Sequence, residues 1–256
     1  MTDDRKTPDV LASMTDCGVC GRPLVYATDS LVRVCDLCGA EHTTMISCPA
    51  GHFVCDSCHG IAAMDVVRHL LVTTTSCDPA AILEQVMSHP GLPMHGPEHH
   101  AIVPGVIIAG ARNAGIPVPD GALETALERA SKVPGGWCGY YGVCGAAVGV
   151  GIAVSILSGA TPVKGMQRSQ ALAATSRVLA RMIDDQPRCC KRASRIAVEA
   201  AVEYLRDRLA IDLAAGDLAR CAYTQRNAQC AREQCPFFAV RDEHGAPAAP
   251  ACEAQG

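Results

Sequence analysis

Residues 17–59 read CGVCGRPLVYATDSLVRVCDLCGAEHTTMISCPAGHFVCDSCH, a stretch dense in cysteine. It contains two matched Cys-x-x-Cys pairs, Cys17 with Cys20 and Cys35 with Cys38, each followed by glycine. Two thiolates at this spacing can lie on one side of a tight turn, and glycine tolerates the backbone angles that the turn needs. The pairs therefore predict a structural zinc site, since four thiolates satisfy the tetrahedral preference of Zn²⁺.

A second set of metal-ligand residues follows in the same stretch: Cys48, His52, Cys55 and Cys58. The sequence thus predicts one or two structural zinc ions. Their arrangement stays open between sequential sites and sites that are cross-braced as in RING-type modules. Such metals contribute on the order of 10 kcal/mol of apparent binding free energy to small modules without a core. Closed four-ligand sites leave no position for a substrate, so we expect this module to stabilise or to dock.

The rest of the chain is expected to be helical. Aromatic residues are only 4% of the chain, which leaves Ala, Val, Ile, Leu and Met to build the core, and such a core favours packed helices over a β-sandwich. Short alternating runs at 24–26 and 31–34 predict the strands of a small hairpin. Apolar spacing and turn signals predict helices at 61–73, from 79 onward, 97–113, 120–132, 145–157, 170–184, 190–209 and 216–226.

The predicted fold is therefore mainly α, with a small N-terminal β module of zinc-ribbon or treble-clef-like type and an all-α domain after it. The expected divisions are a disordered tail (1–15), the zinc module (16–60), the all-α domain (61–240) and a flexible tail (241–256).

Charge and hydropathy exclude several classes of protein. The net charge of −4 offers no attraction to nucleic acid or to an anionic membrane. No secretory signal is evident, and no apolar run reaches the roughly 18 residues of a membrane span. We therefore expect a cytoplasmic protein, in which cysteines serve metals or redox chemistry more often than disulfides.

Two cysteine-containing segments of the helical domain are candidates for chemistry. The first, WCGYYGVCGAA, begins at Trp137 and includes Cys138 and Cys144. Cys144 is expected at the start of a helix, where the dipole and free amides favour its thiolate. Gly145 and Gly149, four residues apart, would let another helix or a ligand approach closely.

The second segment is PRCCKR, which places three cations around Cys189 and Cys190. These cations would stabilise a thiolate or bind an anionic substrate. Adjacent residues on a helix point in different directions, so both thiols are not expected to bind one metal.

Other residues complete the candidate site. The segment HGPEHH supplies His95, Glu98 and His99 as acid–base groups or metal ligands. A last set comprises Cys221, Cys230 and Cys235, and Cys235 precedes a proline as in some iron–sulfur proteins, although the spacings are not those of a ferredoxin.

These motifs together resemble an uncharacterised domain-of-unknown-function family of anaerobic bacteria and archaea. The similarity covers about residues 15–240. It rests on the two Cys-x-x-Cys pairs and on the segments GHFVCDSCH, MHGPEHH, GGWCG, CGAAVGVGI, Ala160-Thr161-Pro162 and PRCCKR. Some members carry the label of S-adenosylmethionine-dependent methyltransferase. The usual fold for methyl transfer needs a parallel sheet and a strand–glycine-loop–helix motif, and no strand is expected before residues 145–151.

The functional hypothesis from sequence is a cytoplasmic metalloenzyme or redox protein acting on a small, anionic substrate. Cys138 and Cys144, together with Cys189 or Cys190, would hold an iron–sulfur cluster or act as reactive thiols. The alternatives are an adaptor whose zinc module binds a protein partner, and a relative of the methyltransferases.

Overall fold

The computed structural model describes residues 17, 22, 24–36, 38–55, 63–89, 91–214, 216 and 220–238. The chain divides into two compact units, Met1–Gly60 and Ile61–Gly256. The two tails expected at 1–15 and 241–256 lie outside the described residues.

The first unit is built on an antiparallel hairpin of β1 (Val25–Val34) and β2 (Glu41–Ser47). Val25 lies opposite Ser47 and Val34 lies opposite Glu41, with an irregularity in register between Tyr26 and Leu31. The two short runs predicted as separate strands therefore belong to one strand. The prediction missed β2, in which two threonines occupy strand positions that suit β-branched residues.

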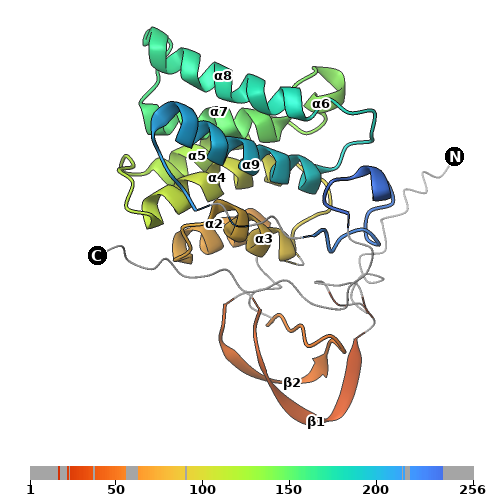
Figure 1. Ribbon diagram of the computed structural model, residues 1–256. Helices are drawn as coiled ribbons and strands as arrows, with labels where there is room; N and C mark the ends of the chain where they lie inside the picture. Colours follow the sequence, from red (N-terminus) through yellow and green to blue (C-terminus); the bar gives the residue numbers. More distant parts are fainter. Residues whose placement is uncertain are drawn as a thin grey trace, which may run out of the picture. The chain divides into compact units, whose positions relative to one another are not determined.

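The second unit is helical. Its elements are α2 (Ala63–Thr73), α3 (Pro79–Ser88), α4 (Glu98–Asn113), α5 (Ala122–Ser131), α6 (Trp137–Tyr140), α7 (Gly145–Ser158), α8 (Gly165–Arg181), α9 (Cys190–Leu209) and the 3₁₀ turn η2 (Arg232–Gln234). Helix α8 packs on α7, α7 packs on α4, and α4 also contacts α2, α3, α5 and α9 (Figure 1). The mainly helical fold with a small cysteine-rich β unit is confirmed.

Helix α4 is the centre of this unit. Its residues from His99 to Ala111 are all buried, so it has no solvent-facing side over that length. A helix that is buried on every side must be surrounded by others. The core around it consists mostly of Ala, Val, Ile and Leu, as the low aromatic content predicts.

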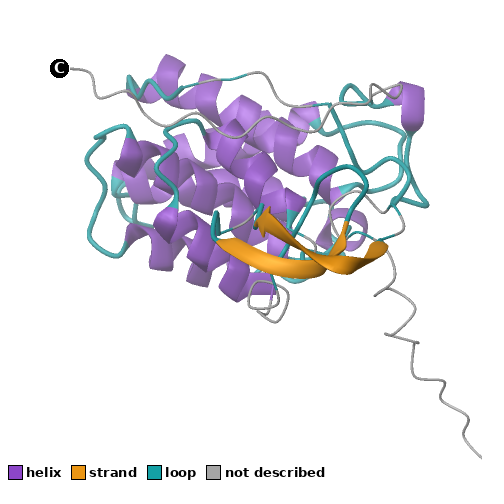
Figure 2. Ribbon diagram, turned by 90° about the horizontal axis from the view of Figure 1, so that it is seen from below, coloured by secondary structure: helices purple, strands orange, loops and turns teal. Residues whose placement is uncertain are grey.

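Local sequence signals account for several helix ends. Asp78 caps α3 by accepting a hydrogen bond from the Ala80 amide at 2.8 Å, and Pro79 occupies the first turn. Helix α9 has the predicted bounds. The helix expected at 216–226 is wrong over its described part, because residues 222–226 form turns and Cys221 forms an isolated bridge with Phe238. Most of the described chain after α9 runs as loop (Figure 2).

Across the residues that the structure describes, none of the helices combines the length and the apolar character that crossing a membrane requires.

Two glycines of α7 allow its close contact with α4. A Cβ at Gly145 would lie 2.3 Å from the His100 ring, and one at Gly149 would lie 2.8 Å from Pro104. The spacing of these glycines in the sequence predicted a close approach, and the structure identifies α4 as the partner. The contact brings the first residues of α4 beside the first residues of α7.

We predict that Gly145→Ala lowers the free energy of unfolding by about 1–3 kcal/mol, because the added methyl overpacks a buried contact. The His100 ring cannot move away freely, since its Nδ1 donates to the Val133 carbonyl at 2.9 Å. Gly165→Ala is the matched control: Gly165 is the first residue of α8, and its Cβ would meet nothing within 4 Å. Urea unfolding of both variants measures the difference, and equal stabilities would contradict the close contact.

Candidate metal centres and a cysteine-lined cavity

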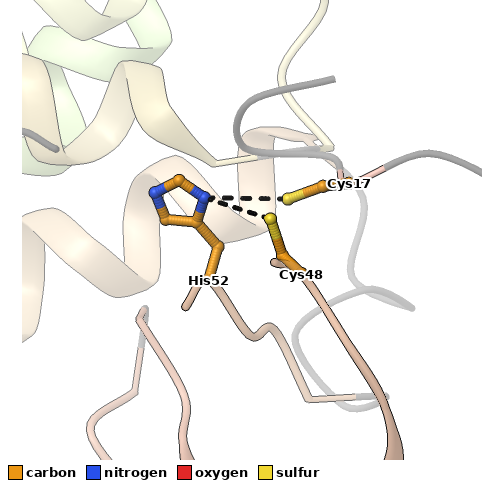
Figure 3. A group of neighbouring side chains, drawn as sticks. All are labelled: Cys17, Cys48 and His52. Carbon is orange, nitrogen blue, oxygen red and sulfur yellow. Dashed lines mark hydrogen bonds between the residues drawn. The ribbon is translucent and has the colours of Figure 1, made fainter. Parts of the chain in front are cut away.

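The first candidate metal centre joins Cys17, Cys48 and His52 (Figure 3). The His52 Nδ1 atom lies 3.9 Å from the Cys17 sulfur and 3.7 Å from the Cys48 sulfur. Ligand atoms at zinc distances in a tetrahedral site lie about 3.5–3.8 Å apart. Both cysteines are buried. These three side chains could therefore hold a metal ion, and zinc fits their chemistry.

The second candidate centre joins Cys35, Cys38 and Cys55, whose sulfur atoms lie within 4.8 Å of one another. Cys38 and Cys55 are 3.9 Å apart, and the Cys55 amide donates to the Cys35 sulfur at 3.4 Å. Amide-to-sulfur hydrogen bonds of this kind are expected around thiolate ligands. This group also could hold a zinc ion.

The hairpin explains why these ligands interleave along the chain. Cys17 precedes β1 and Cys48 follows β2, and the register places these two ends together. Cys35 and Cys38 lie in the turn at the other end. The chain after His52 returns to that turn, where the Phe53 amide donates to the Asp36 carboxylate at 2.8 Å.

The described ligands thus follow the cross-braced arrangement, one of the two that the spacing left open. The sequence offered no means of choosing, because the choice depends on strand pairing. The remaining predicted ligands, Cys20 and Cys58, lie outside the described residues.

In the second unit, one open cavity of about 430 Å³ brings together the three segments that the sequence singled out. It is lined by the start of α4, by the segment from Gly135 through α6 to the start of α7, and by the segment between α8 and α9. The first residues of α4, α7 and α9 all border it. Helix amino ends carry partial positive charge and free amides, so this convergence favours an anionic ligand.

Most of the predicted site residues line this cavity: Cys138, Cys144, Cys189, Cys190 and His99. Cys138 is exposed, and the other three thiols are partly buried. His100 of the HGPEHH segment and Arg188 of the PRCCKR segment also line the cavity.

Two predicted residues, His95 and Glu98, are not among the residues lining the cavity. The Nε2 atom of His95 lies 3.2 Å from the Asn227 amide oxygen. The Glu98 carboxylate folds back toward Gly96, where its Oε2 atom is buried without a hydrogen-bond partner among the described residues. Their predicted acid–base role therefore has no support from the cavity.

The electrostatics of the thiols differ from the expectation. Burial raises the pKa of Cys144, and this outweighs the amides of Ala146 and Ala147, which lower it. The pKa of Cys190 is also raised, again mainly by burial, with the Gly96 amide acting in the opposite direction. The amides at the helix start thus lower the pKa of Cys144 as predicted, but burial opposes them and is the larger effect.

His99 is the most unusual polar group at the cavity. It is 1% exposed, and neither ring nitrogen makes a hydrogen bond of normal geometry within the described chain, although the Gly96 carbonyl lies near enough to raise its pKa. Burial lowers its pKa to about 3, helped by the nearby charges of Lys191, His100 and His95. The imidazole is therefore neutral at physiological pH and keeps one donor and one acceptor for a ligand.

This shift predicts a pH dependence of stability. Unfolded His99 binds a proton below pH about 6.5, whereas the folded residue resists protonation until about pH 3. The folded state thus loses stability as pH falls between these values. His99→Gln should reduce that slope in urea unfolding at pH 7 and pH 5. His69, an exposed histidine of α2, is the control, and an equal slope in His99→Gln and His69→Gln would contradict the assignment.

Residues 67–238 match DUF5714, described as a family of unknown function. The chain belongs to this family. No curated protein and no solved structure matches it. The matched range includes all three segments that line the cavity, and it excludes the first unit with its two candidate metal centres.

Proposed function

We propose that this DUF5714 protein is a metal-dependent enzyme or redox protein of the cytoplasm. Its cavity would hold an iron–sulfur cluster beside a small anionic substrate, and its first unit would hold two structural zinc ions. The observation that carries the proposal is the convergence of thiols, a neutral imidazole and three helix amino ends on one open cavity. An adaptor role would not call for such a cavity in the helical unit.

Cys138, Cys144 and Cys190 are the proposed cluster ligands. Cys138 is close enough to Cys144 to raise the pKa of Cys144, and Cys144 is close enough to Cys190 to raise the pKa of Cys190. Iron–sulfur clusters are held by cysteine thiolates, and a cluster with three protein thiolates keeps one iron open to a substrate. Such a cluster supplies one-electron or Lewis-acid chemistry when bound.

The same surroundings favour an anionic substrate. The amides at the starts of α4, α7 and α9 border the cavity, and Arg188 adds an exposed guanidinium at its edge. Arginine and helix amino ends both recognise carboxylate, phosphate and similar oxyanions. Neutral His99 could then donate a hydrogen bond to the bound substrate or accept one from it.

In the first unit, Cys20 would complete the centre of Cys17, Cys48 and His52, and Cys58 would complete the centre of Cys35, Cys38 and Cys55. Each ligand set would then be closed and tetrahedral, which suits a structural metal. A reducing cytoplasm would keep all of these thiols available.

The cluster is tested by purifying the full chain under strictly anaerobic conditions and measuring iron and acid-labile sulfide. We expect both in the native chain, and Cys144→Ser/Cys190→Ser should remove the cluster of the cavity while zinc is unchanged. Ser194→Ala, at a buried serine in α9, controls for a general effect of substitution near the cavity. Iron and sulfide contents that do not fall in the double variant would refute the assignment.

The anion site is tested separately by titrating the protein with inorganic phosphate in a calorimeter. Arg188→Ala should weaken binding about tenfold, the effect of losing one charge-assisted hydrogen bond. Arg168→Ala, at an exposed arginine of α8, should leave binding unchanged. Equal affinities for both variants, or no phosphate binding by the native chain, would contradict an anionic substrate.

A further inference from the structure

A second group of cysteines does not include the three proposed to bind the cluster of the large cavity, and only Cys189 of this group also lines that cavity. Cys189, Cys221, Cys230 and Cys235 together line a small, more enclosed cavity. None of the four is in a disulfide. Cys189 is the N-cap of α9, whereas the other three belong to the segment 220–238 that follows this helix. In the sequence, these three resemble iron–sulfur ligands only in the proline that follows Cys235.

The segment 220–238 has little regular structure to hold it. Its ends are joined by the bridge between Cys221 and Phe238, with the Cys221 amide donating to the Phe237 carbonyl at 2.7 Å. Between them run turns and the short η2. Tyr223 is its one fully buried hydrophobic side chain among the described residues. Irregular segments of this length usually need an additional anchor, and a metal bound by the segment would supply one.

The sulfurs receive hydrogen bonds of the kind seen in the candidate zinc centres. In two cases the donor is the amide two residues after the cysteine. The Arg232 amide donates to the Cys230 sulfur at 3.4 Å, and the Tyr223 amide donates to the Cys221 sulfur. The first unit shows this pattern at Cys48, whose sulfur accepts from the Ala50 amide at 3.3 Å. Hydrogen bonds to sulfur orient metal ligands and tune iron–sulfur clusters.

Cys189 lines both cavities, and its hydrogen-bond partner Asn227 lines the small one. Its sulfur accepts from the Arg192 amide at 3.5 Å and from the Asn227 side chain at 3.7 Å. Cys190 instead interacts with the Gly96 amide and with Cys144. The neighbouring thiols therefore face different partners, as expected for adjacent residues at a helix start.

The charge around these cysteines is unbalanced. Lys191 and Arg195 are each 1% exposed, and both lie against the Tyr223 ring. Glu84 pairs with Arg195 and is also the carboxylate that attracts Lys191, whose amino group donates to the Met87 carbonyl at 2.9 Å and lies over the Tyr223 ring. A buried cation normally has an anionic partner. A cluster ligated by thiolates carries net negative charge and would provide it.

We propose that Cys189, Cys221, Cys230 and Cys235 hold a second iron–sulfur cluster, separate from the one proposed for the large cavity. A cluster fits better than a single ion, since no three of these sulfurs lie within 4.8 Å of one another in the described chain, as the ligands of the first unit do. A cluster places several iron and sulfide ions between its ligands and so accepts wider separations. Arg195 lines the same cavity and faces Cys221.

The test compares Cys189→Ser with Cys190→Ser in the full chain, purified anaerobically. Serine is a preferred N-cap residue, so Cys189→Ser keeps the start of α9 intact while it removes a thiolate. Iron, acid-labile sulfide and zinc are measured on the same samples, together with the electron paramagnetic resonance spectrum after reduction. We expect Cys189→Ser to alter or remove one cluster signal and Cys190→Ser to alter or remove a different one. Cys230→Ser/Cys235→Ser should change the same signal as Cys189→Ser.

The outcomes separate the two cluster sites. A single cluster that is lost in Cys189→Ser and in Cys230→Ser/Cys235→Ser, but kept in Cys144→Ser/Cys190→Ser, would support this site and refute the one in the large cavity. Iron and sulfide contents that fall only when Cys144 and Cys190 are replaced, and not in Cys189→Ser or Cys230→Ser/Cys235→Ser, would overturn the second site. A third equivalent of zinc, lost in Cys230→Ser/Cys235→Ser, would replace the cluster by a zinc ion and overturn the proposal as stated.

Discussion

Chelation of zinc from the full chain is expected to unfold the first unit while the helices of the second unit stay folded. The apolar residues of its hairpin cannot hold it together, because several of them are exposed: Val25, Val32, Val34, Met45 and Ile46. Its small buried cluster consists of Cys35 and Cys55 with Phe53 and Val54 packed beside them. Two zinc ions at four ligands each would supply on the order of 10 kcal/mol apiece in apparent binding free energy.

Amide hydrogen exchange before and after chelation measures this effect separately for each unit. We expect the amides of β1 and β2 to lose their protection, and those of α4 to keep it. Cys48→Ser should reproduce the loss without a chelator and should lower the zinc content. Met45→Ala, at an exposed position of β2, is the matched control and should change neither. Protection in the hairpin that survives complete removal of zinc would show that the fold does not depend on metal.

The sequence was informative where a local signal decides the structure. Asp78 and Pro79 mark the start of α3, and the apolar stripe of α9 runs between the predicted ends. The expected 216–226 helix failed because the described residues from 220 onward lack a continuous apolar face, with only Tyr223 deeply buried. A helix of that length is marginal without tertiary packing along one face.

The sites depended on long-range contacts that no local pattern encodes. The pairing of β1 with β2 decides which cysteines share a metal, and Cys17 meets Cys48 only because these strands are antiparallel and in that register. In the second unit, Gly145 and Gly149 indicated a close approach without naming α4 as the partner. That contact places His99 at the same cavity as Cys144. Helix geometry predicted that the adjacent Cys189 and Cys190 point in different directions, and their hydrogen-bond partners do differ.

Glu84→Gln is expected to lower the free energy of unfolding by about 3–5 kcal/mol, because it leaves a buried guanidinium without its counter-charge. Glu84 of α3 and Arg195 of α9 form a two-point pair, with Nε–Oε1 and Nη2–Oε2 distances of 2.5 and 2.7 Å. Arg195 is 1% exposed, and the carboxylate raises its pKa. Lys191 is equally buried one turn away. Burial, with repulsion from nearby arginines, lowers the pKa of Lys191 to about 7. Removing the carboxylate would leave the Arg195 guanidinium unpaired and would lower the pKa of Lys191 further, since Glu84 is one of the groups that raise it.

Urea unfolding of three variants identifies the cause of the loss. Glu128→Gln removes the carboxylate of a solvent-exposed pair with Lys132 and should leave the unfolding midpoint unchanged. Glu84→Gln/Arg195→Met removes both charges of the buried pair and should recover part of the stability, since an apolar side chain of similar length needs no counter-charge. A double variant as unstable as Glu84→Gln alone would mean that packing, and not the unpaired charge, accounts for the loss. Uncharged side chains of similar size could then not replace the buried pair without loss of stability, whereas recovery in the double variant would show that they can.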